Sequence, residues 1–420
     1  MTKKSDAPAI RFKGFSDAWE QRKLASLCEK FTDGDWIESK DQSDFGVRLV
    51  QTGNVGVAEY LDKPNNKKWI SEDTFDRLHC EEVLPGDILI SRLPEPAGRA
   101  CIVPLLGTKM ITAVDCTIVR TAPDMSNKFL VQYLSSQAYF DDVNTCLAGG
   151  TRQRISRGNL ANFNVPIPVK KSEQDAIGMF FGYLDNLITL HQRKFEKLTN
   201  VKKSMLEKMF PQNGSSYPEI RFKGFTDPWE QRKLGDMMNV TSVKRIHQSD
   251  WTDSGVRFLR ARDIVAAAKN EEPDDYLYIS KEKYEEYSTL SGKVGVSDLL
   301  VTGVGTIGVP YLVRNLEPLY FKDGNIIWFQ NSDKIDGKFL FYSFSAEQIQ
   351  GFINESAGIG TVGTYTIESG KKTPISLPNQ IEQAKVGEFF QQLDNLITLH
   401  QRELEKLQNI KKSMLEKMFV

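Results

Sequence analysis

Three closely spaced arginines, Arg152, Arg154 and Arg157, follow a glycine pair in the segment GGTRQRISR. A guanidinium group has paired, coplanar donors that match phosphate oxygens and the O6 and N7 acceptors of guanine. The glycines let backbone amides approach a ligand closely. We therefore expect this segment, including Thr151 and Gln153, to contact DNA or RNA. The alternative is a solvated basic turn.

Other arginines are weaker candidates for the same contacts, because an isolated arginine is most often a surface charge. They are Arg92 and Arg99 in the first half of the chain, and Arg257, Arg260 and Arg262 in the second half.

The second half carries no arginine at the place of this segment, where it reads GIGTVGTYT. Contacts there would depend on hydroxyl groups and lysines, or on the arginines further upstream. The candidates are Thr361, Thr364 and Tyr365, with Lys371 and Lys372 for the phosphate backbone, or Arg260 and Arg262.

Motifs for catalysis are missing. The sequence has no G-x-x-x-x-G-K-[ST] phosphate loop, no H-E-x-x-H and no G-x-S-x-G. Asp336 and Lys338 have a spacing found in metal-dependent nucleases, but the pair occurs in one half only and lacks an acidic partner. These observations favour a binding protein with no catalytic residues and no metal site, and they leave a nuclease as an alternative.

Bulk composition sets limits on where the protein acts. A net charge of −1 and a pI near 6.5 do not by themselves indicate a nucleic-acid binder, so any basic surface must be local. No apolar run approaches membrane-spanning length, and the N-terminus lacks the apolar stretch of a signal peptide. We expect a cytoplasmic protein.

All five cysteines lie in the first half, without a C-x-x-C pair. A disulfide framework or metal site common to both halves is thereby excluded, and we expect reduced, mostly buried thiols. The cysteines are Cys28, Cys80, Cys101, Cys116 and Cys146.

The elements that must position these side chains are repeated within the chain. Residues 10–24 return at 220–234 with 13 of 15 positions identical, and residues 184–210 return at 393–419 with 23 of 27 identical. The two intervening stretches have nearly equal lengths, 159 and 158 residues, but only patchy similarity. A fixed frame around two divergent inserts suits a protein that reads two different targets.

The second repeated element predicts a long helix in each half, from Ser172 to Phe210 and from about Ile381 to Phe419. Apolar residues recur every three to four positions over several heptads, which is typical of a coiled coil. We expect the two helices to pack antiparallel, each roughly 58 Å long at 1.5 Å per residue, and to act as a ruler. The predicted seam contains Leu184, Ile188, His191 and Leu198, and Leu393, Ile397, His400 and Leu407. The paired histidines are interpreted as fixing register, because two histidines are too few ligands for a structural metal site.

The first repeated element predicts a helix start. Asp17 and Asp227 can cap a helix whose third residue is glutamate, and Trp19 and Trp229 can anchor it among phenylalanines. The inserts read as mixed strand and helix with glycine turns between the elements, so the fold class is α+β.

The predicted organisation has five segments and pseudo-twofold symmetry. They are a first reading domain at 1–168, a central helix at 169–210, a linker at 211–219, a second reading domain at 220–377 and a C-terminal helix at 378–420. The linker, PQNGSSYP, is rich in proline, glycine and serine.

The repeated frame resembles the specificity subunit of type I restriction-modification systems over essentially all 420 residues. The similarity lies in FKGFTDPWEQRKL, in the GDILISR segment, in the glycine-rich loop before a strand, and in the helix LDNLITLHQR followed by KKSMLEKMF. The order of these motifs is the same in both halves.

This resemblance implies two target-recognition domains that each read one half of a bipartite, asymmetric site in double-stranded DNA. It implies an antiparallel coiled coil that sets the spacer and docks two modification (methyltransferase) subunits, together with restriction subunits that translocate and cleave DNA. S-adenosylmethionine, ATP and Mg are implied for those partners, and no cofactor for this chain. Thr151, Arg152, Gln153 and Arg154 match the loop of the family in the first copy.

The sequence is also compatible with two rival functions. The first is an adaptor that assembles other proteins through its helices and never touches DNA. The second is the self-sufficient nuclease mentioned above, which would cut DNA in the presence of a metal ion.

Overall fold

A computed structural model describes residues 8–150, 153–212, 214–357 and 363–419. The chain divides into two compact units, Met1–His191 with Glu403–Val420, and Gln192–Arg402. Each unit holds one insert and parts of both long helices. The units therefore cut across the five predicted segments.

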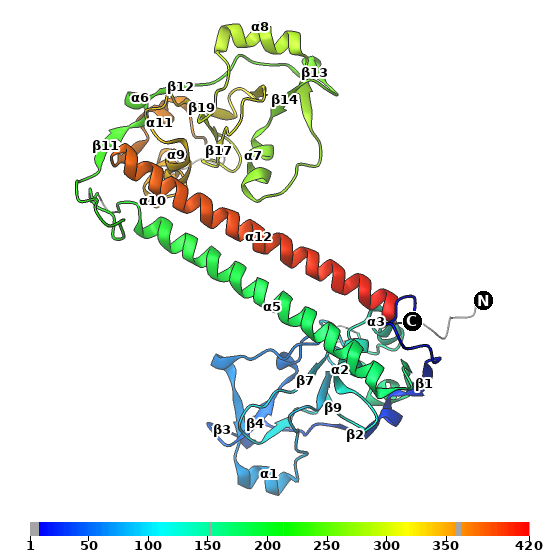
Figure 1. Cartoon of the computed structure of the whole chain (residues 1–420). Helices are drawn as coiled ribbons and strands as arrows, with labels where there is room; N and C mark the ends of the chain where they lie inside the picture. Colours follow the sequence, from blue (N-terminus) through cyan, green and yellow to red (C-terminus); the bar gives the residue numbers. More distant parts are fainter. Residues whose placement is uncertain (1–7, 151–152, 213, 358–362, 420) are drawn as a thin grey trace. The chain divides into compact units, whose positions relative to one another are not determined.

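The first unit contains two four-stranded sheets and one strand pair (Figure 1). The sheets have the strand orders β2-β9-β6-β7 and β3-β5-β4-β8, and all pairings are antiparallel except β4 with β8. The strands are β1 (Glu20–Lys23), β2 (Cys28–Asp33), β3 (Gln42–Ser43), β4 (Val47–Val50), β5 (Lys68–Ile70), β6 (Ile88–Ser91), β7 (Ala100–Ile102), β8 (Met110–Thr112), β9 (Cys116–Thr121) and β10 (Asn164–Ile167).

Short helices connect these strands, and a long one ends the series. They are η1 (Leu24–Leu27), η2 (Ser39–Asp41), η3 (Thr52–Asn54), η4 (Pro64–Asn66), α1 (Glu72–Leu78), α2 (Asn127–Tyr133), α3 (Gln137–Thr145), α4 (Arg157–Asn162) and the long α5 (Lys171–Lys208). Ser71, Ser136 and Ser156 each cap the following helix by accepting a hydrogen bond from a backbone amide.

The second unit repeats this topology with sheets β12-β19-β16-β17 and β13-β15-β14-β18. Its strands are β11 (Glu230–Lys233), β12 (Asn239–Thr241), β13 (Trp251–Thr252), β14 (Val256–Leu259), β15 (Leu277–Ile279), β16 (Leu299–Thr302), β17 (Pro310–Leu312), β18 (Leu319–Phe321), β19 (Ile326–Gln330) and β20 (Pro374–Leu377). Its helices are α6 (Leu234–Met237), η5 (Gln248–Asp250), α7 (Ala261–Ala268), α8 (Lys281–Ser291), α9 (Gly337–Ser343), α10 (Glu347–Ser356), α11 (Ile367–Lys372) and the long α12 (Gln380–Met418). The predicted α+β class with a repeated domain is confirmed.

The long helices run antiparallel within each unit. In the first unit, Phe419 after the end of α12 stacks on Phe181 near the start of α5, with ring centroids 5.9 Å apart. In the second unit, Phe210 after the end of α5 stacks on Phe390 near the start of α12 at the same distance. The two contacts are made by equivalent residues of the two repeats.

The residues of the predicted seam are only partly buried. Leu184 and Leu393 are buried, and Leu407 and Leu198 pack against the hydrophobic cores of the first and second units. Ile188 and Ile397 are half-buried, as are His191 and His400.

The repeated tryptophans are anchors of the core, as predicted. Trp19 packs edge-on against Phe129 of α2, and Trp229 against Phe339 of α9. Both indole rings are almost fully buried.

The predicted helix start at Asp17 and Asp227 is wrong. The residues that follow form β1 and β11, which pair antiparallel with β10 and β20. These partners lie more than 140 residues further along the chain, and their backbone hydrogen bonds override the local capping pattern. Asp17 instead forms an ion pair with Lys170 at 2.8 Å.

A buried ion pair fixes the start of each repeat to its long helix. Arg11 donates to both carboxylate oxygens of Glu173 at 2.6 and 2.8 Å, and Arg221 donates to Glu382 at 2.7 and 2.8 Å. Both carboxylates are buried, and this pairing raises the pKa of each arginine. The repeated arginine in the IRFKGF motif therefore has a structural role.

Candidate nucleic-acid interface

An arginine cluster lies where β2 ends in the first unit. The side chains of Arg92 and Arg157 both face Asp33, with nitrogen–oxygen distances of 3.5 and 3.8 Å. Arg154 faces Asp115 at 3.9 Å. We call these five residues the arginine cluster.

Backbone hydrogen bonds hold the cluster together. The amide of Ile155 donates to the carbonyl of Arg92 at 3.2 Å, and Ile155 is fully buried between two exposed arginines. Ala148 and Arg154 form a β-bridge, and Ser156 caps α4, which begins with Arg157. The segment predicted from its arginines is thus anchored at 154–157.

The exposed arginines of the cluster are not saturated by their carboxylates. Arg120, a structural arginine of the same unit, binds Asp87 through two hydrogen bonds of 2.7 and 2.9 Å. The ion pairs of the cluster are about 1 Å longer, and Arg154 and Arg157 remain 62% and 46% exposed. Their guanidinium groups are therefore oriented but available to a ligand.

Not every predicted residue belongs to this surface. Arg99 donates five hydrogen bonds to backbone carbonyls, which engage all three of its guanidinium nitrogens, and burial lowers its pKa. Gln153 is exposed. Thr151, Arg152 and Thr361 lie outside the described residues.

The equivalent place in the second unit is uncharged. The positions of Asp33, Arg92, Asp115, Arg154 and Arg157 are taken there by Ser242, Gly303, Asn325, Thr364 and Ile367, as the matching strand pairings and hydrogen bonds show.

Tyr365 is a core residue rather than a contact residue. Its ring is buried, and its hydroxyl group lies 2.5 Å from Thr373 Oγ1. Burial raises the pKa of this hydroxyl. Thr364 is exposed next to it, as are Lys371, which pairs with Glu368, and Lys372.

Arg260 and Arg262 are engaged with acidic neighbours. Arg260 binds Asp263 and Asp275 and is largely buried, whereas Arg262 pairs with Asp275 and is 60% exposed. Their guanidinium groups stabilise the start of α7 and the loop before β15. Arg257 packs over the ring of Tyr276 at 3.9 Å.

The sequence interpretation missed a basic pair in the second unit. Arg245 is 66% exposed and binds Asp323 at 2.9 Å, and Lys244 lies over the ring of Tyr287 at 4.7 Å. Both follow β12, as residues 34–36 follow β2 in the first unit. The adjacent lysine and arginine in the sequence are the signal that could have identified this basic pair.

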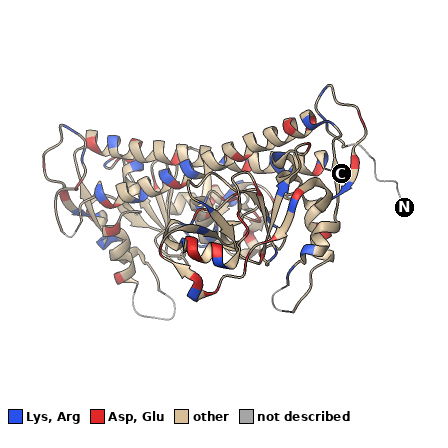
Figure 2. Cartoon of the chain, turned by 90° about the horizontal axis from the view of Figure 1, so that it is seen from below, with Lys and Arg blue, Asp and Glu red and all other residues tan. Residues whose placement is uncertain are grey.

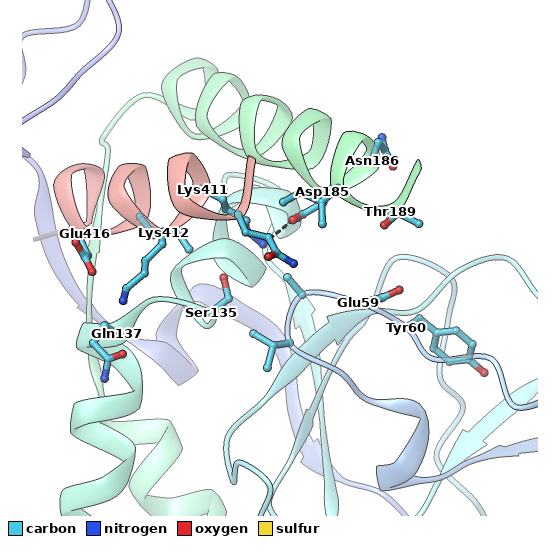
Figure 3. A pocket seen from close by; sticks show the side chains of 15 residues that line it. Glu59, Tyr60, Ser135, Gln137, Asp185, Asn186, Thr189, Lys411, Lys412 and Glu416 are labelled. Atoms are coloured by element: carbon cyan, nitrogen blue, oxygen red, sulfur yellow. Dashed lines mark ion pairs between the residues drawn. The ribbon is translucent and has the colours of Figure 1, made fainter. Parts of the chain in front are cut away.

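A pocket opens beside the long helices in the first unit (Figure 3). It has a volume of about 590 Å³, and Lys411 and Asp185 form an ion pair on its wall. Asn186, Ile188 and Thr189 continue this wall along α5. The loop 57–60 and Ser135 line the opposite side.

The second unit has the equivalent pocket, of about 740 Å³. Five residues of its helix wall repeat those of the first pocket, with Asp394, Asn395, Ile397 and Thr398 on α12 and Lys202 on α5. The loop that faces this wall differs, being 267–270, whereas Ser345 stands where Ser135 does. Acidic and basic residues are interspersed along both helices, so neither presents a uniformly charged face (Figure 2).

The proposed nuclease residues have structural roles. Asp336 caps α9 by accepting a hydrogen bond from the Phe339 amide at 2.8 Å, and Lys338 pairs with Glu388 at 2.6 Å. Among the described residues, no three histidine, cysteine or acidic side chains gather as they would to hold a metal ion. Within the residues that the structure describes, no helix is long and apolar enough to cross a membrane.

Comparison with known proteins agrees with the repeat. Residues 16–200 and 226–409 each match the family described as "Type I restriction modification DNA specificity domain". The chain is 27% identical over 270 residues to the type I restriction enzyme MjaVIII specificity subunit of Methanocaldococcus jannaschii, and this alignment covers 60% of each chain. It is 21% identical over 420 residues to the putative MjaX specificity subunit of the same organism, covering 94% of this chain and 92% of the relative.

The fold is also that of a solved structure. The S subunit of a type I restriction-modification system from M. genitalium matches with a TM-score of 0.64 at 15% identity, over 99% of both chains. This likeness supports the fold assigned to the repeats.

Proposed function

The chain belongs to the family of type I restriction-modification DNA specificity domains, and from this premise we propose that its two repeats read the two halves of a bipartite, asymmetric site in double-stranded DNA. It is a DNA-recognition protein and not an enzyme. The finer assignment, one half-site per repeat, is supported by the contrast between a repeated frame and divergent inserts.

The arginine cluster is the observation that carries this proposal for the first repeat. Two exposed guanidinium groups are held about 4 Å from carboxylates, outside hydrogen-bond distance, on a segment whose backbone is fixed by hydrogen bonds. Such groups supply phosphate contacts and base-edge contacts. In the second repeat, Lys244, Arg245 and Thr364 are the exposed candidates.

The repeated pockets support a second part of the proposal, the docking of two modification subunits. Their helix walls have five residues in common in the two repeats, whereas the facing loops differ. Two walls with these five residues in common suit two copies of one partner. We propose that restriction subunits join this assembly.

Cofactors belong, in this proposal, to the partners. Modification subunits would use S-adenosylmethionine, and restriction subunits would use ATP and Mg, while this chain binds none of them. The assembly would act on DNA in the cytoplasm.

DNA affinity of the assembled complex tests the role of the cluster. The chain is purified with its modification subunits, and binding of a duplex is followed by fluorescence anisotropy at fixed salt. Arg154→Ala and Arg157→Ala should each weaken binding by about 1–3 kcal/mol if the side chain is bidentate to guanine. Arg22→Ala is the matched control, because Arg22 lies on a different element, β1, and forms an ion pair with Asp124.

The adaptor alternative predicts a different result. An assembled complex that binds duplex DNA equally in the wild type and in both arginine variants would remove the cluster from the interface. A complex that assembles and binds no DNA would favour the adaptor.

A further inference from the structure

The arginine cluster contains two carboxylates that a phosphate-binding surface does not need. Asp33 lies between Arg92 and Arg157, and its Oδ1 accepts a hydrogen bond from Thr117 Oγ1 at 2.9 Å, which fixes it against β9. Asp115 faces Arg154 and is 32% exposed. Carboxylates at this place repel the DNA backbone, and that backbone supplies most non-specific affinity.

The geometry of the cluster is that of oriented arginines rather than of closed ion pairs. Arg92 is nearly buried, and it donates through Nη2 to the carbonyl of Val114 at 2.6 Å, while its Nε is buried without a hydrogen-bond partner. The structural pair between Arg11 and Glu173 is instead closed by two bonds of 2.6 and 2.8 Å. The carboxylates of the cluster therefore align the guanidinium groups and leave their donors open.

We propose that Asp33 and Asp115 are specificity-determining residues of the first repeat, an inference that rests on the proposed DNA-binding function. They hold Arg154 and Arg157 toward base edges and disfavour contacts with phosphate. Arginine donates to guanine O6 and N7, and an aspartate accepts from the amino group of cytosine. The half-site read by the first repeat therefore contains a G·C pair.

The second repeat provides an internal control. Ser242 and Asn325 stand at the positions of Asp33 and Asp115, so neither carboxylate is reproduced there. Changes at Asp33 and Asp115 should leave the other half-site unaltered.

The test maps methylated adenines by sequencing after co-expression with the modification subunits in a host without adenine methylation. The half-site that changes with Arg154→Ala is the one read by the first repeat. In the wild type this half-site should contain a G·C pair, preferred about tenfold or more over A·T. In Asp33→Asn and in Asp115→Asn, this preference should fall below about threefold, with the second half-site unchanged.

Affinity for unrelated duplex DNA gives an independent readout. Removing one negative charge should strengthen this binding. The slope of the logarithm of the binding constant against the logarithm of salt concentration should become steeper by up to about 0.9. Asp124→Asn removes the same charge from an exposed pair on another element and should change neither the motif nor the affinity. Gel filtration shows whether each variant still assembles. Because Asp115 is partly exposed, Asp115→Asn is the variant expected to affect folding less.

Two outcomes overturn the inference while sparing the proposed function. One is a first half-site made of A·T pairs alone, and the other is a wild-type motif in both aspartate variants. A wild-type complex that assembles but methylates no defined site overturns the proposed function as well.

Discussion

Lys411 of α12 forms an ion pair with Asp185 of α5, with its Nζ 2.5 Å from the carboxylate. The second unit repeats this contact between Lys202 and Asp394 at the same distance. In each unit a side chain of the adjacent short helix adds a hydrogen bond to the aspartate, from Gln132 in the first and from the Tyr342 hydroxyl in the second. We call each group of three side chains a node, and each node joins both long helices to the globular part of its unit.

We predict that breaking this node destabilises the unit that contains it. Asp185→Lys places two ammonium groups together and should lower the free energy of unfolding by about 1–3 kcal/mol. The double exchange with Lys411→Asp should recover part of the loss. Urea unfolding measures both, and a change within about 0.5 kcal/mol for the single variant would show that the node contributes nothing.

A glycine on each long helix permits close approach of a short helix. A Cβ atom at Gly178 would lie 2.7 Å from the Phe129 amide nitrogen, and one at Gly387 would lie 2.9 Å from the Phe339 nitrogen. Gly178→Ala should therefore displace α2 and cost about 1–3 kcal/mol. Thermal unfolding measures the loss.

Gly182→Ala, one turn further along α5, is the matched control. A Cβ there would meet nothing within 4 Å, and alanine is the better helix former. This variant should be more stable than the wild type by up to about 1 kcal/mol. Equal effects at the two positions would contradict the packing described.

The buried pair between Arg11 and Glu173 should be far more important than a surface pair. Glu173→Gln leaves the buried guanidinium group without its counter-charge and should cost about 3–5 kcal/mol. The control is Glu219→Gln, because Glu219 is 67% exposed beside Lys208, and its loss should cost about 1 kcal/mol or less. Similar losses in urea unfolding would place the Arg11 pair among ordinary surface contacts.

Thiol reactivity should follow burial. Burial raises the pKa of Cys101 to about 12 and that of Cys116 to about 11. Because only the thiolate reacts and it forms as pH approaches the pKa, both should resist alkylation at pH 8 and react after unfolding in urea. Cys146, which is half-buried, should react first in the native protein. Mass spectrometry of the alkylated peptides identifies each site, and rapid native modification of Cys101 would contradict its burial.

Long-period patterns predicted the fold well, and local signals did not. The two long helices begin and end within two residues of their predicted bounds, because their apolar repeat persists over many turns. The capping pattern at Asp17 failed, because the strand partner of the next residues lies in a distant part of the chain.

The candidate interface could be predicted only in part, because residue type does not reveal what a guanidinium group binds. Arg99 and Arg154 are alike in sequence terms, yet all three guanidinium nitrogens of Arg99 donate to backbone carbonyls, whereas Arg154 stays exposed. Asp33 and Asp115 carry no local motif, and only the sheet brings them to the arginines. Arg245 was missed, although the adjacent Lys244 makes a basic pair visible in the sequence.

The most direct test of two-site DNA reading is the methylation map of the wild-type complex, formed by co-expressing this chain with its modification subunits in a host without adenine methylation. We predict one split motif, with two short defined halves around an unspecified spacer. Methylation confined to a single continuous motif, or absent from a stably assembled complex, would contradict it.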